Sequence, residues 1–159
     1  MPSLKHVRLN NSSYSITVDE EDFDRIKSLK WNLMQLGTIC STIRITGKQI
    51  NITNFIMRDS KMYDHKDRNI FNCSKENLRE ATKSQNSMNT EKVDRFKPCS
   101  SKFKGVSYIK KTNKYRAYIT LNKITKNLGH YTSELDAAKA YNKAAIQLFK
   151  DFACLNEVD

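Results

Sequence analysis

Four polar residues between positions 64 and 86 have the side-chain chemistry of metal-assisted hydrolysis. They are Asp64, His65, Asn77 and Asn86. Carboxylate and amide oxygens are hard ligands that Mg²⁺ accepts, and this ion keeps several waters while making few protein contacts. A neutral imidazole is suited to taking a proton from water near neutral pH. The set therefore indicates a hydrolytic site that uses one divalent cation.

A hairpin of two strands and a helix must position these side chains. The sequence predicts a strand over residues 61–66, a loop over 67–75, a return strand over 76–79 and a helix over 81–89. This layout places His65 at the end of the first strand.

Residues 62–89 resemble the core of an HNH nuclease, the ββα-metal fold of homing endonucleases. The resemblance rests on Asp-His at 64–65, Glu-Asn-Leu-Arg at 76–79 and Thr-Lys-Ser-Gln-Asn at 82–86. It implies that His65 is the general base, and that Asn77 orients His65 and braces the hairpin. It also implies that Asp64 and Asn86 hold one Mg²⁺, or alternatively Mn²⁺, at the scissile phosphate of double-stranded DNA.

Two positions depart from the pattern of that family. Family members often have a histidine where this chain has Thr53, and commonly a glycine where it has Arg68-Asn69. Asn69 makes the turn feasible, because asparagine tolerates a positive φ better than most residues. The departures keep a non-enzymatic alternative open, a sequence-specific DNA-binding regulator whose nuclease core has decayed.

The residues before this core are expected to form its scaffold. Alternating apolar residues predict a strand over 14–18 and a hairpin over 38–52, with a type II′ turn at Gly47-Lys48. An apolar stripe predicts a helix over 20–30, capped by Asp19.

Positive charge is concentrated in the second half of the chain. The net charge is +11, and residues 95–126 hold ten basic residues and no acid. A one-signed stretch interleaved with tyrosines is typical of a nucleic-acid surface. An RNA-binding or structural protein is a further alternative.

The sequence predicts a soluble, intracellular protein. No apolar run approaches the roughly 18 residues of a membrane span, and the N-terminus lacks the apolar region of a secretory signal. The four cysteines (Cys40, Cys73, Cys99, Cys154) form no Cys-x-x-Cys pair, which favours buried thiols over disulfides or a structural zinc site.

The C-terminal part is predicted to contain strands over 103–109, 114–121 and 125–131, followed by a helix over 133–150. Lys-Gly-Val-Ser, Lys-Tyr-Arg-Ala-Tyr-Ile and Leu-Gly-His-Tyr occur here in order. By these motifs the segment resembles the plant ethylene-response-factor (Apetala-type) DNA-binding domain. The expected fold class is α+β, with a nuclease domain (1–90), a linker (91–101) and a DNA-binding domain (102–159) made of a three-stranded antiparallel sheet and one helix.

Alternation along residues 114–121 puts the polar set, including Arg116, on the face opposite the helix. In the resembled family this face lies in the DNA major groove. The resemblance and the pattern together nominate as DNA-binding residues Lys104, Ser107, Tyr108, Lys110, Lys111, Lys114, Arg116, Tyr118, Thr120, Lys123, Thr125 and Asn127. Arg116 is the expected base-reading residue, because a guanidinium can bond two acceptors of guanine at once.

The sequence as a whole thus predicts a metal-dependent DNA endonuclease of the homing or mobile-element type. Its oligomeric state and its target sequence stay open.

Overall fold

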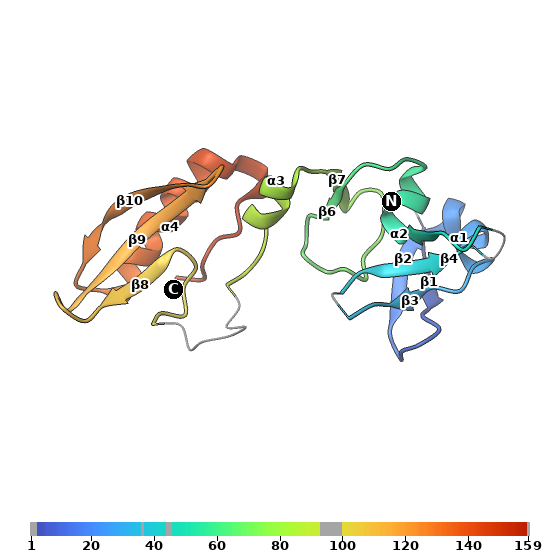
Figure 1. Ribbon diagram of the computed structural model, residues 1–159, viewed down its shortest axis with the longest axis horizontal. Helices are drawn as coiled ribbons and strands as arrows, with labels where there is room; N and C mark the ends of the chain where they lie inside the picture. Colours follow the sequence, from blue (N-terminus) through green and yellow to red (C-terminus); the bar gives the residue numbers. More distant parts are fainter. Residues whose placement is uncertain (1–2, 36, 44–45, 93–99, 159) are drawn as a thin grey trace. The chain divides into compact units, whose positions relative to one another are not determined.

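A computed structural model describes residues 3–35, 37–43, 46–92 and 100–158, which belong to two compact units, 1–82 and 83–159 (Figure 1). The boundary falls after Thr82, ahead of the predicted linker, of which residues 93–99 lie outside the described part. The helix expected to complete the nuclease core therefore packs with the C-terminal unit.

The first unit is built from short strands and two helices. Its described elements are β1 (Leu4–Arg8), β2 (Ser15–Asp19), α1 (Glu20–Lys27), β3 (Asn32–Leu33), β4 (Ile39–Thr42), β5 (Gln49–Asn51), α2 (Ile52–Met57), β6 (Tyr63–His65) and β7 (Leu78–Glu80). The strands pair antiparallel in three small sheets, in the orders β1-β2, β3-β4-β5 and β6-β7.

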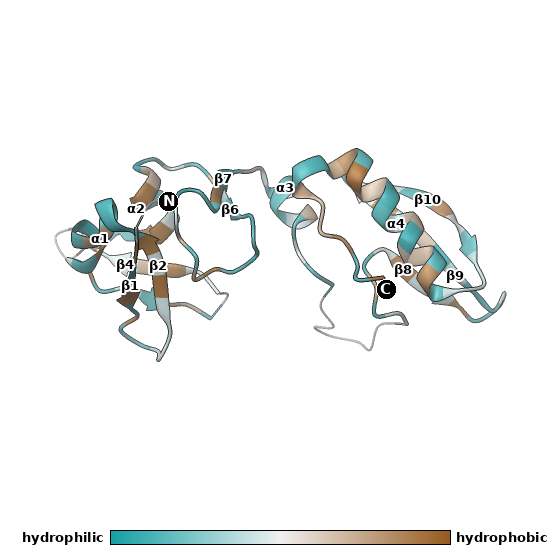
Figure 2. Ribbon diagram, turned by 180° about the vertical axis from the view of Figure 1, so that it is seen from behind, coloured by the Kyte–Doolittle hydropathy of each residue, from teal (hydrophilic) through white to brown (hydrophobic). Residues whose placement is uncertain are grey.

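Alternation along β2 supplies the centre of the first core. Ile16 and Val18 are fully buried, together with Ile26 of α1 and with Trp31, whose indole N–H donates to the carbonyl of Ile26 at 2.8 Å. Figure 2 shows hydrophobic residues on β1 and β2. Each fully buried side chain of this size contributes about 1.5–3 kcal/mol. Trp31 is therefore a core aromatic residue.

Three local predictions for this unit differ from the structure. Helix α1 ends at Lys27, three residues early, and the Asp19 side chain makes no capping hydrogen bond. Strands β1 and β3 were not expected, because their residues lack a clear apolar alternation. In the β4–β5 hairpin Thr42 pairs with Gln49, so the connection is longer than a two-residue turn; residues 44–45 lie outside the described part.

The second unit is a three-stranded antiparallel sheet covered by a long helix. Its described elements are α3 (Lys83–Met88), β8 (Val106–Ile109), β9 (Lys114–Leu121), β10 (Ile124–Tyr131), α4 (Glu134–Phe149) and a 3-10 turn (Lys150–Phe152). The strand order is β10-β9-β8. Ser133 caps α4 by accepting from the N–H of Asp136 at 3.4 Å. Both units are mixed, which is compatible with the predicted α+β class.

Small residues let α4 lie close to the sheet. Ala137, Ala138 and Ala145 are fully buried against β9, where Ala117 and Ile119 face them. Leu128 sits at a β-bulge in β10, where the register with β9 shifts between Asn127 and Gly129, and it packs on the same core.

Candidate active site and nucleic-acid surface

The β6–β7 hairpin carries the predicted catalytic pair. Asp64 pairs with Arg79 and His65 with Leu78 across the two strands, so Asp64 and His65 point to opposite faces of the hairpin. Just beyond the last strand pair, the N–H of Lys66 donates to the Asn77 carbonyl at 2.9 Å and extends the hairpin. His65 thus stands at the mouth of the loop that connects the strands.

A hydrogen-bond network of amide and carboxylate side chains fixes the conformation of that loop. Oδ1 of Asp67 accepts from the N–H of Asn69 at 2.8 Å and from Nδ2 of Asn77 at 2.9 Å, and Oδ2 accepts from Nδ2 of Asn72 at 2.7 Å. Oδ1 of Asn77 accepts in return from the Asp67 N–H at 3.0 Å. Burial disfavours the ionised Asp67 carboxyl, but the hydrogen bonds from Asn72, Asn69 and Asn77 outweigh it and lower its pKa. Asn77 is therefore a bracing residue of the loop.

The left-handed residue in this turn is Arg68, with φ 65°, and not Asn69 as expected. Its N–H donates to the His65 carbonyl at 2.9 Å, which closes the turn directly behind the histidine. Asn69 instead receives the Asp67 hydrogen bond. An arginine therefore occupies the backbone conformation for which the resembled family uses glycine.

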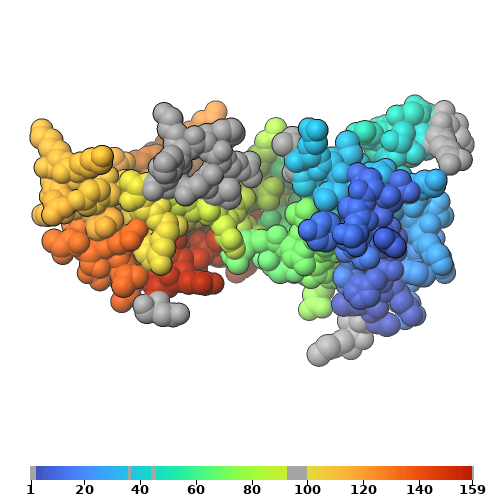
Figure 3. All heavy atoms as spheres, turned by 90° about the horizontal axis from the view of Figure 1, so that it is seen from below, coloured from blue at the N-terminus to red at the C-terminus, as the bar shows by residue number. Residues whose placement is uncertain are grey.

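The N-terminal hairpin anchors the far side of the loop. Thr17 of β2 donates its N–H to the Phe71 carbonyl and accepts from the Cys73 N–H, both at 2.8 Å, forming a parallel bridge to Asn72. Oδ2 of Asp19 accepts from the Lys75 N–H at 2.8 Å, which explains why this carboxylate does not cap α1. In Figure 3 the dark blue atoms of the N-terminal hairpin lie against the green atoms of the loop.

His65 sits in a partly buried position that keeps its ring neutral. Burial lowers the pKa of His65, while the nearby carboxylates of Asp67 and Asp64 oppose the shift. Its Nε2 atom lies 3.9 Å from Sγ of Cys73, a fully buried thiol whose pKa is raised to about 12 by burial and by Asp67. The ring therefore has the unprotonated form that a general base requires at neutral pH. The sequence gave no signal for Cys73 as its neighbour, because the contact depends on how the loop folds back.

Asp64 is held by an arginine that the sequence reasoning did not assign. Nε and Nη2 of Arg79 both donate to Oδ2 of Asp64, at 2.9 and 2.6 Å, and both side chains are largely buried. Strand alternation from Asn77 to Arg79 could have indicated this partner, since the two strands pair in register. Asn86 lies on α3 in the second unit, so the predicted metal ligands Asp64 and Asn86 belong to different units.

Thr53, at the family's histidine position, is buried in α2. Its N–H and Oγ1 both donate to Oδ1 of Asn51, the cap of that helix, at 3.1 Å each. Thr53 therefore helps to cap the N-terminus of α2. Within the described residues, no group of three or more His, Cys, Asp or Glu side chains is placed to hold a metal ion.

The sheet of the second unit gathers most of the predicted DNA-binding residues on one face. Strand pairing places Ser107, Arg116 and His130 in one row, Tyr118 beside Asn127, and Thr120 beside Thr125, whose hydroxyls lie 2.9 Å apart. The Arg116 guanidinium lies over the Tyr118 ring, 5.1 Å from its centroid, and its Nε is buried with no hydrogen-bond partner in the described part of the chain. His130, which is not among the predicted DNA-binding residues, joins this row because it pairs with Arg116.

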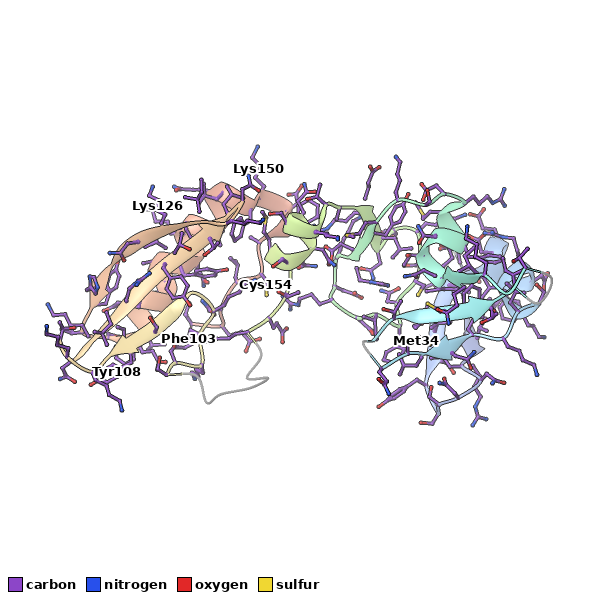
Figure 4. All side chains as sticks on the ribbon, viewed as in Figure 1. Met34, Phe103, Tyr108, Lys126, Lys150 and Cys154 are labelled. Atoms are coloured by element: carbon purple, nitrogen blue, oxygen red, sulfur yellow. The ribbon has the colours of Figure 1, made fainter. Side chains whose placement is uncertain are left out.

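Two predicted DNA-binding residues lie elsewhere. Tyr108 pairs with Tyr115 on the opposite face, the two rings 5.1 Å apart, because it follows Ser107 by one residue. Nζ of Lys104 donates to the carbonyls of Met88, at 2.6 Å, and Thr90, so this amine secures the end of α3. Exposed lysines at the strand ends and turns make up the rest of the predicted set, namely Lys110, Lys111, Lys114 and Lys123. Figure 4 shows Lys126 of β10 and Lys150 at the end of α4, two further exposed lysines.

No helix among the described residues is long and apolar enough to cross a membrane. Among the described cysteines, Cys40, Cys73 and Cys154 form no disulfide, while Cys99 lies outside the described part.

A curated relative is similar to most of this chain. It is a protein of Acanthamoeba polyphaga mimivirus named as an uncharacterized HNH endonuclease, 38% identical over 127 residues. The matched segment covers 79% of this chain and 59% of the relative, so the chain spans less than two thirds of the relative's length. No protein-family model matches the sequence, and no solved structure matches the chain.

Proposed function

We propose that this chain is a metal-dependent HNH endonuclease that hydrolyses phosphodiester bonds in double-stranded DNA, as homing or mobile-element nucleases do. The observation that carries the proposal is the β6–β7 hairpin, which presents a neutral His65 at the mouth of a loop braced by Asn77. The similarity to a protein named as an HNH endonuclease supports the same reading.

In this proposal His65 takes the proton from the attacking water. A base acting on water must be unprotonated at working pH and held in a fixed orientation. The first condition follows from the burial of the ring, and the second from the short connections between His65, Arg68 and the Asn77–Asp67 pair. Asn77 acts through the loop and does not itself touch the water.

The carboxylate of Asp64 suits a hard divalent cation, Mg²⁺ or Mn²⁺. An ion of this kind keeps most of its waters and needs few protein ligands. The cation would share the Asp64 carboxylate with Arg79, which donates two hydrogen bonds to Oδ2. When bound, the ion would neutralise negative charge on the scissile phosphate. No structural zinc is proposed.

The second unit would supply affinity and site choice as an Apetala-type DNA-binding domain. Its supporting feature is the row of Ser107, Arg116 and His130 on the open face of the sheet, with Arg116 preoriented on the Tyr118 ring. A guanidinium fixed in this way can bond both acceptors of a guanine with little loss of side-chain entropy.

Substitution of His65 by Ala tests the proposal on supercoiled plasmid with Mg²⁺. We expect cleavage to fall by at least about a hundredfold, because the base is lost, while DNA affinity stays unchanged, because phosphate contacts lie elsewhere. His6→Ala is the matched control, since His6 is an exposed histidine of the same unit. Cleavage by the His65→Ala protein at the wild-type rate, or cleavage that survives EDTA, would contradict the assignment.

A second candidate function is a DNA-binding regulator without nuclease activity. The observation that favours it is the bidentate hold of Arg79 on Asp64, since a carboxylate neutralised by arginine has less need of a metal. Plasmid that stays supercoiled under saturating wild-type protein with Mg²⁺ or Mn²⁺, together with specific DNA retention, would select this candidate.

A further inference from the structure

A cavity of about 790 Å³ lies within the second unit, at the edge of its sheet. It sits where α3 crosses the end of β9 beyond the edge strand β8. Strand β8 pairs with β9 only as far as Val106 opposite Ala117, followed by one bond from the Tyr118 N–H to the Gly105 carbonyl at 2.8 Å. Among the described strands, none pairs with this edge of β9 past Tyr118. The cavity occupies that place.

The walls of the cavity are basic and the floor is aromatic. Four lysines line the cavity and no Asp or Glu does. This is unusual, because protein surfaces generally mix positive and negative side chains. The apolar part comes from Met88, Tyr118, Tyr141 and Phe149. The full lining is Lys83, Ser84, Ser87, Met88, Lys92, Lys104, Gly105, Tyr118, Thr120, Asn122, Lys123, Tyr141 and Phe149. Ligand pockets typically measure about 300–1,000 Å³ and combine an apolar body with a few polar groups.

Lys92 and Lys104 hydrogen-bond to backbone carbonyls around the cavity, whereas Lys83 lies on α3 and Lys123 in the β9–β10 turn. Nζ of Lys92 donates to the carbonyls of Ser101, Phe103 and Val106, at 2.6, 3.0 and 3.2 Å, so its charge meets neutral oxygens. Lys83 begins α3, and Lys123 lies in the β9–β10 turn. Ser84 ties the two sides by donating to Asn122 at 3.4 Å.

Lys123 occupies a position that turn chemistry assigns to glycine. Leu121 pairs with Ile124, and both residues between them have positive φ, 50° at Asn122 and 67° at Lys123, as in a type I′ hairpin. The usual sequence for this turn is Asn-Gly. A lysine at the second position is strained there, so the turn alone does not account for it.

We propose that this cavity binds one nucleotide unit, with its phosphate between Lys83 and Lys123 and its base against Tyr118, the partly exposed aromatic side chain of the floor. The basic rim suits a phosphate, and the aromatic floor suits the flat face of a base. The same chemistry is offered by a free mononucleotide and by a nucleotide displaced from a DNA strand. The site is separate from the β6–β7 hairpin and requires no cleavage there.

The test is titration of the full chain with dAMP, with inorganic phosphate and with a short single-stranded DNA oligonucleotide, without divalent metal. Backbone NMR shifts are followed at Ser84, Thr120 and Asn122. We expect dAMP to bind at least about fivefold more tightly than phosphate, because only dAMP reaches the floor. Tighter binding of the oligonucleotide would identify a strand as the source, and weaker binding a free nucleotide.

Lys123→Gly gives the sharpest variant. It should raise the stability of the protein, because glycine suits the type I′ turn, and weaken dAMP binding by about tenfold, because a phosphate contact is lost. Lys83→Gln should weaken binding similarly. Lys139→Gln is the control, since Lys139 is an exposed lysine of α4 outside the cavity. Equal binding of phosphate and dAMP, an equal loss in the control, or undiminished dAMP binding in both cavity variants would overturn the proposal.

Discussion

The ion pair between Asp64 and Arg79 decides how the proposed cation site works. The Asp64 side chain is 6% exposed and that of Arg79 14%, so neither charge is well solvated. Removing one partner of a buried pair leaves the other uncompensated, which costs about 3–5 kcal/mol. The pair therefore stabilises the hairpin whenever no cation is present.

Replacing Arg79 by Met should make the hairpin depend on the cation. Without metal we expect a loss of about 3 kcal/mol in the free energy of unfolding. Saturating Mg²⁺ should restore much of it, since a ligand at a hundred times its dissociation constant contributes about 2.7 kcal/mol. Thermal unfolding with and without Mg²⁺ measures both effects.

Lys61→Met is the matched control. Lys61 pairs with Glu80 across the same hairpin, but both side chains are more than half exposed, at 56% and 62%. An exposed pair is worth less than about 1 kcal/mol, so this variant should lose little and gain nothing extra from Mg²⁺. An identical Mg²⁺ response in both variants would speak against a cation at Asp64.

For single residues, the sequence indicated which side chains belong to the candidate site better than it indicated their contacts. Asn77 could be named as a bracing residue, because its motif recurs in the resembled family. Arg79 and Cys73 could not, because their contacts depend on strand register and on a buried loop path. Asn69 was preferred to Arg68 for the left-handed turn position on propensity, and the hydrogen bond from the Asn69 N–H to Asp67 decided otherwise.

Among the elements, helix α4 packs closely against the backbone of Gly105. A Cβ atom built there would lie 2.0 Å from Cδ2 of Tyr141 and 2.6 Å from the carbonyl oxygen of Tyr118, and the residue has φ +71°. Tyr141 is 2% exposed and has no room to withdraw. The Lys-Gly-Val-Ser motif therefore has a packing reason for its glycine.

We expect Gly105→Ala to destabilise the second unit by about 2–5 kcal/mol, combining overpacking with the cost of a positive φ. Gly47→Ala is the matched control in the first unit, because Gly47 has φ +65° but no atom within 4 Å of a built Cβ. The control should lose only about 1–2 kcal/mol. Chemical denaturation of both variants gives the comparison, and equal losses would mean that conformation rather than packing selects Gly105.

Helix α1 is joined to the loop of the candidate site by a buried carboxylate. Asp22 is 1% exposed, and its oxygens lie 2.5 Å from Nη2 of Arg25 and 2.8 Å from Nζ of Lys75. Burial disfavours the ionised form, but Lys75 and Arg25 outweigh it, so the pKa is below its ordinary value of 3.8.

This carboxylate predicts acid sensitivity of the first unit. Because the pKa of Asp22 is lower in the folded state, its ionised carboxylate contributes its full stabilisation above the unfolded-state pKa of 3.8. This contribution is lost as the pH falls through the folded-state pKa. We expect Trp31 fluorescence to report a loss of stability below about pH 4. Asp22→Asn should flatten that dependence at a cost of about 1–3 kcal/mol. Asp24→Asn, on the exposed side of the same helix, should leave it intact; an unchanged profile in Asp22→Asn would rule out Asp22 as the source.

Elements with a strong period were predictable and short ones were not. Strand β9 begins and ends where the alternation predicted, and α4 follows its alanine stripe and serine cap. Strands β1 and β3 escaped prediction because they are held by pairing with β2 and β4 rather than by a pattern of their own.

For the molecule as a whole, the single tryptophan lies in the first unit and the longest helix in the second. Trp31 is 1% exposed in the first core, while α4 contributes much of the helical signal. Two compact units with separate cores need not unfold together. We therefore expect tryptophan fluorescence and far-ultraviolet circular dichroism to give different denaturation midpoints. Coincident curves would show that the two units unfold as one.

The uneven charge agrees with this division. Residues 91–159 carry 14 Lys and Arg against 7 Asp and Glu, whereas residues 1–90 carry 14 against 10. The sequence predicted two units, but it placed their boundary later than the structure does and assigned α3 to the first unit. The reason is Met88, which packs on Phe149 and Ile119 of the second core, a contact that composition and motif order do not reveal.

The bridge between Thr17 and Asn72 has a consequence for the order of folding. It joins residues 55 positions apart, so the chain must close a long loop before the bridge can form, whereas the β1–β2 and β6–β7 hairpins close locally. The loop behind His65 therefore takes its final shape late in the folding of its own unit. Every residue that it needs precedes α3 in the chain, so a nascent chain can complete this loop before its second unit is fully synthesised.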